Sequence, residues 1–133
     1  MKTRSAKNKG KRLQNSVRDI LLETFTEQLE PDDIRSTSMG CNGEDCQLSP
    51  AARKLIPCSI ECKNVERLNI WSTIDQAVLN SGGHHPMIVM KRNNIKPWAA
   101  VPWTFLLELL KSRVECQVST SKETNEIKEN EAN

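Results

Sequence analysis

Residues 58–65 read CSIECKNV, and their side chains alternate in character along the chain. The two cysteines and Ile60 fall on one face of an extended chain, whereas Ser59, Glu61 and Lys63 fall on the other. Alternation of this kind predicts a β-strand with one buried face. It also sets the Glu61 carboxylate beside the Lys63 amine, because residues two apart on a strand leave the same face.

Three short elements are predicted just upstream of this strand. Residues 33–38 and 44–48 are strand candidates, and a glycine-containing turn separates them. Ser49 and Pro50 then open one helical turn, with Ser at the N-cap and Pro at the first helical position, and Pro57 closes it.

Two helices are predicted from apolar side chains that recur at helical spacing. The first begins near Gly10 and is stopped by Pro31. Its apolar stripe is Leu13, Val17, Leu21, Phe25 and Leu29. The second covers residues 70–79. Its expected buried side is Ile70, Trp71, Ile74, Ala77 and Val78.

Two further strands are predicted, at residues 86–91 and 98–101. A last helix is predicted to begin at Pro102, and its apolar face consists of Trp103, Leu106, Leu107 and Leu110. The order is therefore helix, three strands, helix, two strands, helix, an αβββαββα order over residues 9–113. Such an order predicts a single α/β domain with one central mixed β-sheet flanked by helices.

The charges are balanced in total but segregated along the chain. The formal net charge is +2, from 19 Lys and Arg against 17 Asp and Glu, which excludes a histone-like polycation. Residues 1–18 carry seven bases and no acid, and residues 114–133 carry five acids and two bases. We expect residues 1–8 to be a flexible basic arm and residues 114–133 to be an acidic, disordered tail.

Other features limit the class of protein. No apolar run approaches the ~20 residues of a membrane-spanning helix, and the polar N-terminus is not a secretory signal. Five cysteines without an export signal predict free thiols in a reducing cytoplasm, buried as small apolar groups, with a zinc site that includes His84-His85 as the less favoured alternative. The tryptophans Trp71, Trp98 and Trp103 are expected in the core or at a dimer contact, and stacking on bases is their less favoured role.

A candidate metal site follows from three charged residues. Asp45 lies after a glycine-containing turn, at the start of a predicted strand. If this carboxylate and Glu61 converge from adjacent strands beside Lys63, they form a hard oxygen site for Mg²⁺. The alternative is a surface ion pair between Glu61 and Lys63, which would contribute little to stability.

These residues carry a resemblance to a known family. The PD-(D/E)xK nuclease motif resembles two segments of this chain, which are separated by a spacer. They are Gly43-Glu44-Asp45 and Ile60-Glu61-Cys62-Lys63. Two further segments resemble those of one branch of this family, the archaeal-type Holliday junction resolvases, as in small phage-encoded resolvases. Lys9-Gly10 at the start of the first helix is similar to the Lys-Gly start of that branch. Arg35-Ser36, before the motif, is similar to its Arg-Ser segment. The resemblance implies a restriction-endonuclease-like fold and a Mg²⁺-dependent, structure-selective DNA endonuclease, with Mn²⁺ able to substitute.

The resemblance also implies roles for individual residues. Asp45 and Glu61 would be the metal-binding carboxylates, and the backbone carbonyl of Cys62 would be a further ligand. Lys63 would orient the attacking water or stabilise charge on the phosphate. Gln14 stands where the family often has a glutamate, so it would hydrogen-bond a water bound to the metal. Gln76 resembles a glutamine near the active site of related nucleases.

The DNA is expected to be contacted mainly through its phosphates. The candidate contacts are Lys7, Lys9, Lys11, Arg12, Arg35, Ser36, Arg53, Lys54, Gln76 and Lys91, with Arg92 and Lys96 as further bases. The implied substrate is branched or double-stranded DNA in recombination or repair, inside a bacterial host cell if the protein is phage-encoded. The two-fold symmetry of a four-way junction implies a homodimer. Two alternatives stay open: another DNA nuclease of the same fold (a nickase, flap nuclease or recombination exonuclease), and a non-catalytic DNA-binding accessory protein.

Overall fold

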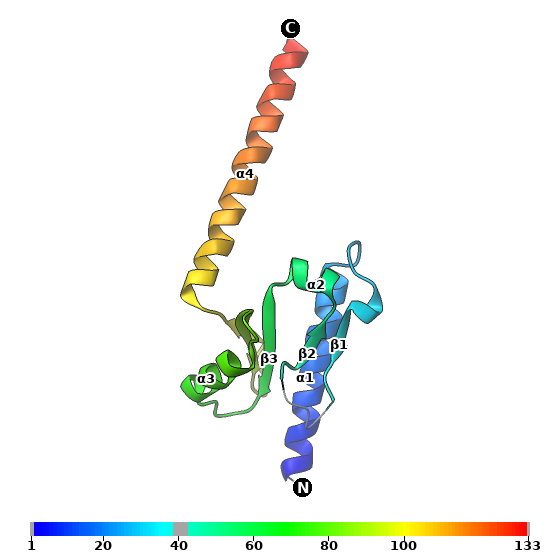
Figure 1. Ribbon diagram of the computed structural model, residues 1–133, viewed down its shortest axis with the longest axis vertical. Helices are drawn as coiled ribbons and strands as arrows, with labels where there is room; N and C mark the ends of the chain where they lie inside the picture. Colours follow the sequence, from blue (N-terminus) through cyan, green and yellow to red (C-terminus); the bar gives the residue numbers. More distant parts are fainter. Residues whose placement is uncertain (1, 39–42, 133) are drawn as a thin grey trace. The chain divides into compact units, whose positions relative to one another are not determined.

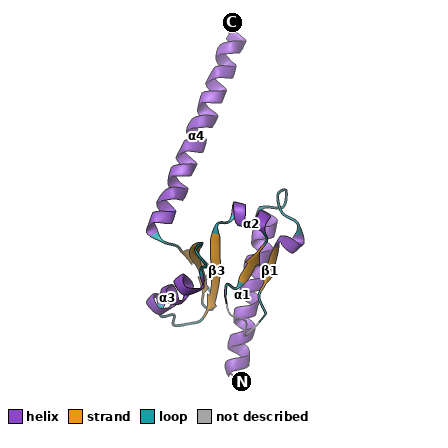
Figure 2. Ribbon diagram, viewed as in Figure 1, coloured by secondary structure: helices purple, strands orange, loops and turns teal. Residues whose placement is uncertain are grey.

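The computed structural model describes residues 2–38 and 43–132. The chain divides into two compact units between residues 101 and 102. The elements of the first unit are α1 (Lys2–Thr24), a short 3-10 helix (Pro31–Asp33), β1 (Ile34–Ser36), β2 (Cys46–Leu48), α2 (Pro50–Leu55), β3 (Cys58–Asn64), α3 (Ile70–Asn80), β4 (His85–Lys91) and β5 (Trp98–Ala100). The second unit holds α4 (Trp103–Ala132), and Figure 2 distinguishes the helices from the strands.

The five strands form one mixed sheet in the order β1-β2-β3-β4-β5. The pairs β1/β2, β2/β3 and β4/β5 are antiparallel, whereas β3 and β4 run parallel from Cys58↔His85 to Asn64↔Lys91. A parallel pair needs a crossover, and α3 supplies it. The predicted α/β class with a mixed sheet is therefore confirmed, and β3 is its central strand.

Both faces of β3 are covered. On one face, Cys46 of β2 pairs with Ile60 of β3. The Cys46 thiol lies against α1, 3.9 Å from the carbonyl oxygen of Gln14. On the other face the Ser59 hydroxyl donates to the carbonyl oxygen of Asn80 in α3. β3 accordingly lies between α1 and α3 (Figure 1). The expectation of a single buried face was wrong, because a central strand of a sheet with helices on both sides buries its polar positions as well.

Helix α1 differs from the prediction at both ends. It begins at Lys2, so residues 2–8, which were expected to be a flexible basic arm, are part of this helix. Lysine, arginine and alanine are good helix formers, and the single Gly10 costs only about 1 kcal/mol inside a helix. The helix ends at Thr24, where the amides of Gln28 and Leu29 both donate to the carbonyl of Phe25. This tight turn brings Leu29 back into the core.

The buried face of α3 is also shifted from the one expected. Thr73 and Ala77 are buried, whereas Trp71 and Val78 are exposed. Thr73 can be buried because its hydroxyl donates to the carbonyl oxygen of Asn69, which leaves no unsatisfied polar group.

All three tryptophans are exposed, Trp71 at 76%, Trp98 at 69% and Trp103 at 68%, so their expected place in the core was wrong.

Helix α4 forms the second unit by itself. It extends from Trp103 to Ala132, so residues 114–132 are helical where a disordered tail was expected. Residues 103–132 contain neither glycine nor proline, and they are rich in Leu, Glu and Lys, which favour helix over coil.

Of the cysteines, Cys46, Cys58 and Cys62 are buried as expected, Cys116 is exposed, and Cys41 lies outside the described residues.

A candidate active site

A pocket of about 450 Å³ lies at one end of β3 and gathers residues from four parts of the first unit. It is lined by Lys7 and Gln14 from α1, by Asp45 just before β2, by Glu61, Cys62 and Lys63 from β3, and by Gln76 and Asn80 from α3. The structure therefore brings together all the residues predicted to act in catalysis or metal binding. Because they come from segments far apart in the sequence, this convergence is a property of the tertiary fold.

Asp45 is held in place by three hydrogen bonds. Its backbone amide donates to the carbonyl oxygen of Ile60 at 2.8 Å, and its carbonyl oxygen accepts from the amide of Thr37 at 2.8 Å. Its carboxylate accepts from the backbone amide of Cys62 at 2.6 Å. β3 therefore fixes both the backbone and the side chain of Asp45 before any ligand binds.

Glu61 is 4% exposed and faces Asp45. Burial raises the pKa of both carboxyl groups, and the nearby Asp45 charge raises the pKa of Glu61 further. The two side chains interact directly, and this interaction lowers the pKa of Asp45 and raises that of Glu61. The side-chain amide of Asn80 donates to Glu61 at 3.0 Å and opposes this rise. A buried pair of carboxyl groups thus has to bind a cation or a proton.

Lys63 lies on the same face of β3 as Glu61 and lines the same pocket. Its charge lowers the pKa of Asp45 and of Glu61, although burial outweighs this effect at both carboxyl groups. The Glu61 carboxylate is buried against Asp45 and Asn80, so the alternative of a surface ion pair with Lys63 does not hold.

Gln14 is oriented by a small polar network. The amine of Lys11 donates to the Ser36 hydroxyl and to the Thr37 carbonyl oxygen, both at 3.0 Å. The Ser36 hydroxyl in turn donates to the side-chain oxygen of Gln14 at 3.0 Å. The oxygen of Gln14 thus accepts one hydrogen bond, and its side chain lines the pocket, where the amide group can donate to an acceptor. Lys11 and Ser36, predicted as DNA contacts, serve here to position Gln14.

Arg53 was predicted as a phosphate contact, and its guanidinium group is instead engaged within the protein. Both terminal nitrogens donate to the carboxylate of Glu44, and one also donates to the carbonyl oxygen of Cys58. The two side chains are only 20% and 19% exposed. This ion pair ties α2 to the segment that carries Asp45, so we assign Arg53 to the stability of the site.

We expect Arg53→Ala to lower the free energy of unfolding by about 1–3 kcal/mol, because it leaves the largely buried Glu44 carboxylate without its partner. Urea denaturation would measure the loss. The exposed neighbour offers a control, and Lys54→Ala is expected to change stability by less than about 0.5 kcal/mol. Equal stability of the two variants would show that the ion pair contributes nothing.

The other predicted DNA contacts are dispersed. Lys7 lines the pocket, and Arg12, Arg35 and Lys54 are exposed elsewhere on the first unit. The amine of Lys9 donates to the side chain of Asn93 at 2.9 Å, which ties α1 to the turn between β4 and β5. Lys91 lines a different pocket.

Sequence reasoning did not find Asn80, which donates to Glu61. A signal for it was present: the buried positions of α3 are Thr73 and Ala77, and the same helical spacing continues to Asn80. A polar residue on that face of α3 points toward the polar face of β3.

The donor set suits a small hard cation. Within the described residues, no three His, Cys, Asp or Glu side chains gather at one point. The pocket therefore offers a cation two carboxylates and neutral groups as ligands, beside the amines of Lys7 and Lys63. Mg²⁺ is often held by only one or two carboxylates, with waters and substrate phosphates completing its shell. Two buried carboxyl groups that repel each other when ionised fit such an ion.

No family model, curated protein or solved structure matches this chain. Within the described residues, the helices are either too short or too polar to cross a lipid bilayer.

Proposed function

We propose that this protein is a Mg²⁺-dependent, structure-selective DNA endonuclease with a restriction-endonuclease-like fold of the PD-(D/E)xK type, and that it resolves four-way junctions. The observation that carries the proposal is the buried Asp45–Glu61 pair, which opens into a pocket that also holds Lys63 and Gln14. A carboxylate pair buried this way is costly for stability, which favours a functional origin for it.

Each side chain has a task in phosphodiester hydrolysis. Asp45, Glu61 and the backbone carbonyl of Cys62 would hold Mg²⁺ or Mn²⁺. When bound, such an ion polarises a phosphoryl oxygen and lowers the pKa of a water molecule. The amine of Lys63 orients the water or stabilises negative charge that develops on the phosphate. The amide protons of Gln14 bind a phosphate oxygen or the water, and Asn80 keeps Glu61 ionised and oriented.

The substrate would approach along exposed basic side chains. Lys7 stands at the wall of the pocket, and Arg12 is exposed on another part of α1. Both bind phosphates without reading bases, which suits recognition of DNA by shape. Two symmetric cuts in a four-way junction require two active sites, so we propose a homodimer as the acting species.

The test of this proposal is a cleavage panel with purified protein in Mg²⁺. The panel contains a four-way junction, a flap, a linear duplex and a single strand of matched sequence. We expect the junction to be cut fastest, with 5′-phosphate ends. Preferred cutting of a flap, of one duplex strand or of DNA ends would instead indicate a flap nuclease, nickase or exonuclease. Binding of the junction without cutting in Mg²⁺ or Mn²⁺ would identify an accessory protein.

Asn80→Ala is expected to shift the pH dependence of cleavage. The Asn80 amide lowers the pKa of Glu61, so its removal raises that pKa, and a larger fraction of Glu61 is protonated at neutral pH. Cleavage would fall by about tenfold at neutral pH, as for other partners of metal ligands, and would recover at alkaline pH. The measurement is the rate against pH, with Asp75→Asn on the exposed side of α3 as the control. An equal loss at every pH would mean that Asn80 acts only through the fold.

A further inference from the structure

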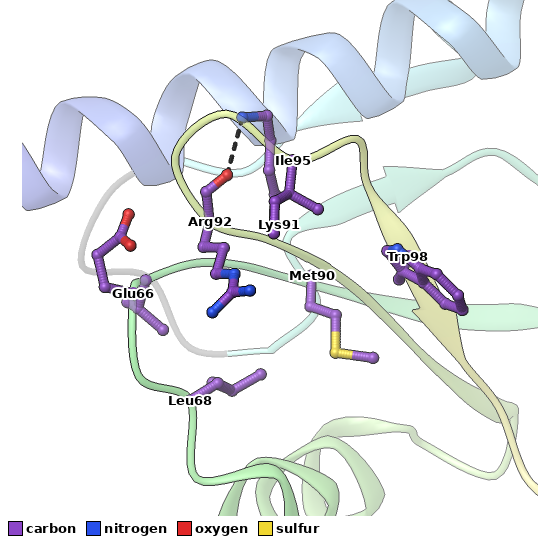
Figure 3. Close-up of a pocket in the computed structure, with 8 residues that line it drawn as sticks. Glu66, Leu68, Met90, Lys91, Arg92, Ile95 and Trp98 are labelled. Carbon is purple, nitrogen blue, oxygen red and sulfur yellow. Dashed lines mark hydrogen bonds between the residues drawn. The ribbon is translucent and has the colours of Figure 1, made fainter.

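A second pocket, of about 270 Å³, lies beside the candidate active site, and the two pockets share Val65. Its lining is mainly apolar, from Val65, Leu68, Met90 and Ile95, and the indole of Trp98 stands at its side with 69% of the residue exposed. The guanidinium group of Arg92 points into the space between Leu68 and Met90 (Figure 3). An apolar pocket that contains a cation suits a flat ligand with apolar faces and a nearby negative charge.

The sheet register connects this pocket to the catalytic face. Lys63 pairs with Met90 across β3 and β4, and Met90 pairs with Trp98 across β4 and β5. Paired residues on neighbouring strands leave the same face, so Trp98 lies on the face that carries Lys63 and Glu61. Two strand spacings separate Lys63 from Trp98, or about 10 Å. About three stacked nucleotides of a DNA strand span this distance, at about 3.4 Å each.

The walls of the pocket are held in place from both sides. The backbone amide of Asn93 donates to Glu66 at 2.8 Å, and the Asn93 side chain accepts from Lys9 of α1 at 2.9 Å. The turn itself contains Asn94 at a φ of 63°, a left-handed conformation that asparagine tolerates. Lys91 and Arg92 both line the pocket beside a single carboxylate, that of Glu66, so the excess positive charge at the rim is complementary to a phosphate backbone.

We propose that this pocket takes one unstacked base of the DNA substrate, which stacks on Trp98 beside the Arg92 guanidinium while a neighbouring phosphate binds the basic rim. This inference rests on the proposed nuclease function and adds a substrate class to it. A fully paired duplex keeps its bases stacked, whereas a branch point or a bulge presents them at low cost. Recognition of such DNA would then come from one free base near the bond to be cut.

The test compares the binding of two DNA duplexes in EDTA, where no cleavage occurs. They share one sequence, and one of them carries a single unpaired 2-aminopurine, a fluorescent base. We expect the wild-type protein to bind the bulged duplex more tightly and to quench its fluorescence. Trp98→Ala should reduce that preference by about tenfold, because stacking of a base on an aromatic side chain contributes this much. Trp98→Phe should retain most of it.

Trp71→Ala is the matched control, since Trp71 is also largely exposed but lies on α3 and lines neither pocket. It should keep the wild-type preference. The proposal is overturned if Trp98→Ala keeps the preference, or if Trp71→Ala loses it equally. It is also overturned if Trp98→Ala changes only the molar mass in light scattering, which would make Trp98 a contact between two copies of the chain.

Cleavage by the wild-type protein separates this inference from the proposed function. If the protein binds bulged DNA through Trp98 but never cuts any DNA, the pocket is supported and the nuclease proposal fails. If it cuts DNA but shows no preference for the unpaired base, the pocket proposal fails and the nuclease proposal stands.

Discussion

Glu61→Gln is expected to reduce cleavage of branched DNA by about 10³-fold and, at the same time, to make the metal-free protein more stable. The change removes one of the two carboxylates of the pocket but keeps a side chain of the same shape. The glutamine oxygen can still accept from Asn80, and its amide can donate to Asp45, so the local hydrogen bonds are retained.

The gain in stability follows from the raised pKa of Glu61. A carboxyl group whose pKa is higher in the folded state than in the unfolded state stabilises the fold at acidic pH. That contribution is lost as the pH rises through the folded-state pKa. The wild type therefore bears the cost of ionising Glu61 beside Asp45 at neutral pH, whereas the glutamine variant does not. We expect the Tm of the variant to be higher by about 4 °C at pH 7, and the difference to shrink toward pH 4.

Thermal unfolding and cleavage rates measure the two effects separately. Mg²⁺ should raise the Tm of the wild type but not of Glu61→Gln, because a ligand stabilises the fold only when it binds the folded state. Glu27→Gln, an exposed change outside the pocket, is the control and should resemble the wild type in both assays. If Glu61→Gln cuts DNA normally, the active-site assignment is wrong. If it unfolds more easily than the wild type, Glu61 serves the fold.

Lys63→Ala is expected to reduce cleavage by about 10²–10³-fold with little loss of DNA affinity. The amine lies beside the carboxylate pair, where it would act on charge that develops only during hydrolysis. A single phosphate contact, by contrast, would reduce affinity and lower the salt dependence of binding by about one counterion. Rates at saturating DNA and dissociation constants at several salt concentrations distinguish these two roles.

A second measurement isolates the direct role of Lys63. Its charge lowers the pKa of Asp45 and Glu61, so Lys63→Ala also raises both values and weakens the metal site at neutral pH. If the variant recovers full activity at alkaline pH, Lys63 acts only by keeping the carboxylates ionised. A loss that persists there supports direct action on the phosphate or the water. Lys111→Ala, an exposed change in α4, is the control.

The local elements were predictable because the signals that specify them are local. The alternation of residues 58–65 predicted β3, and the Ser49-Pro50 pair predicted the start of α2, where the Ser49 hydroxyl accepts from the amide of Ala52. Helix ends were less predictable. The start of α1 at Lys2 depends on the weak helix preferences of a polar segment, and its end depends on a turn that packs Leu29.

The sequence by itself determined the order of the five strands and the longer helices, with the short helix α2 between β2 and β3. It also determined that Glu61 and Lys63 share one face of β3, since both results follow from residue spacing and backbone geometry. Only the tertiary structure decided that β3 is covered on both sides, that Asp45 meets Glu61 there, and that Asn80 holds Glu61. It also decided that Glu44 pairs with Arg53. The physical reason is that burial and distance between segments far apart in the chain depend on how the layers pack, which no local spacing encodes.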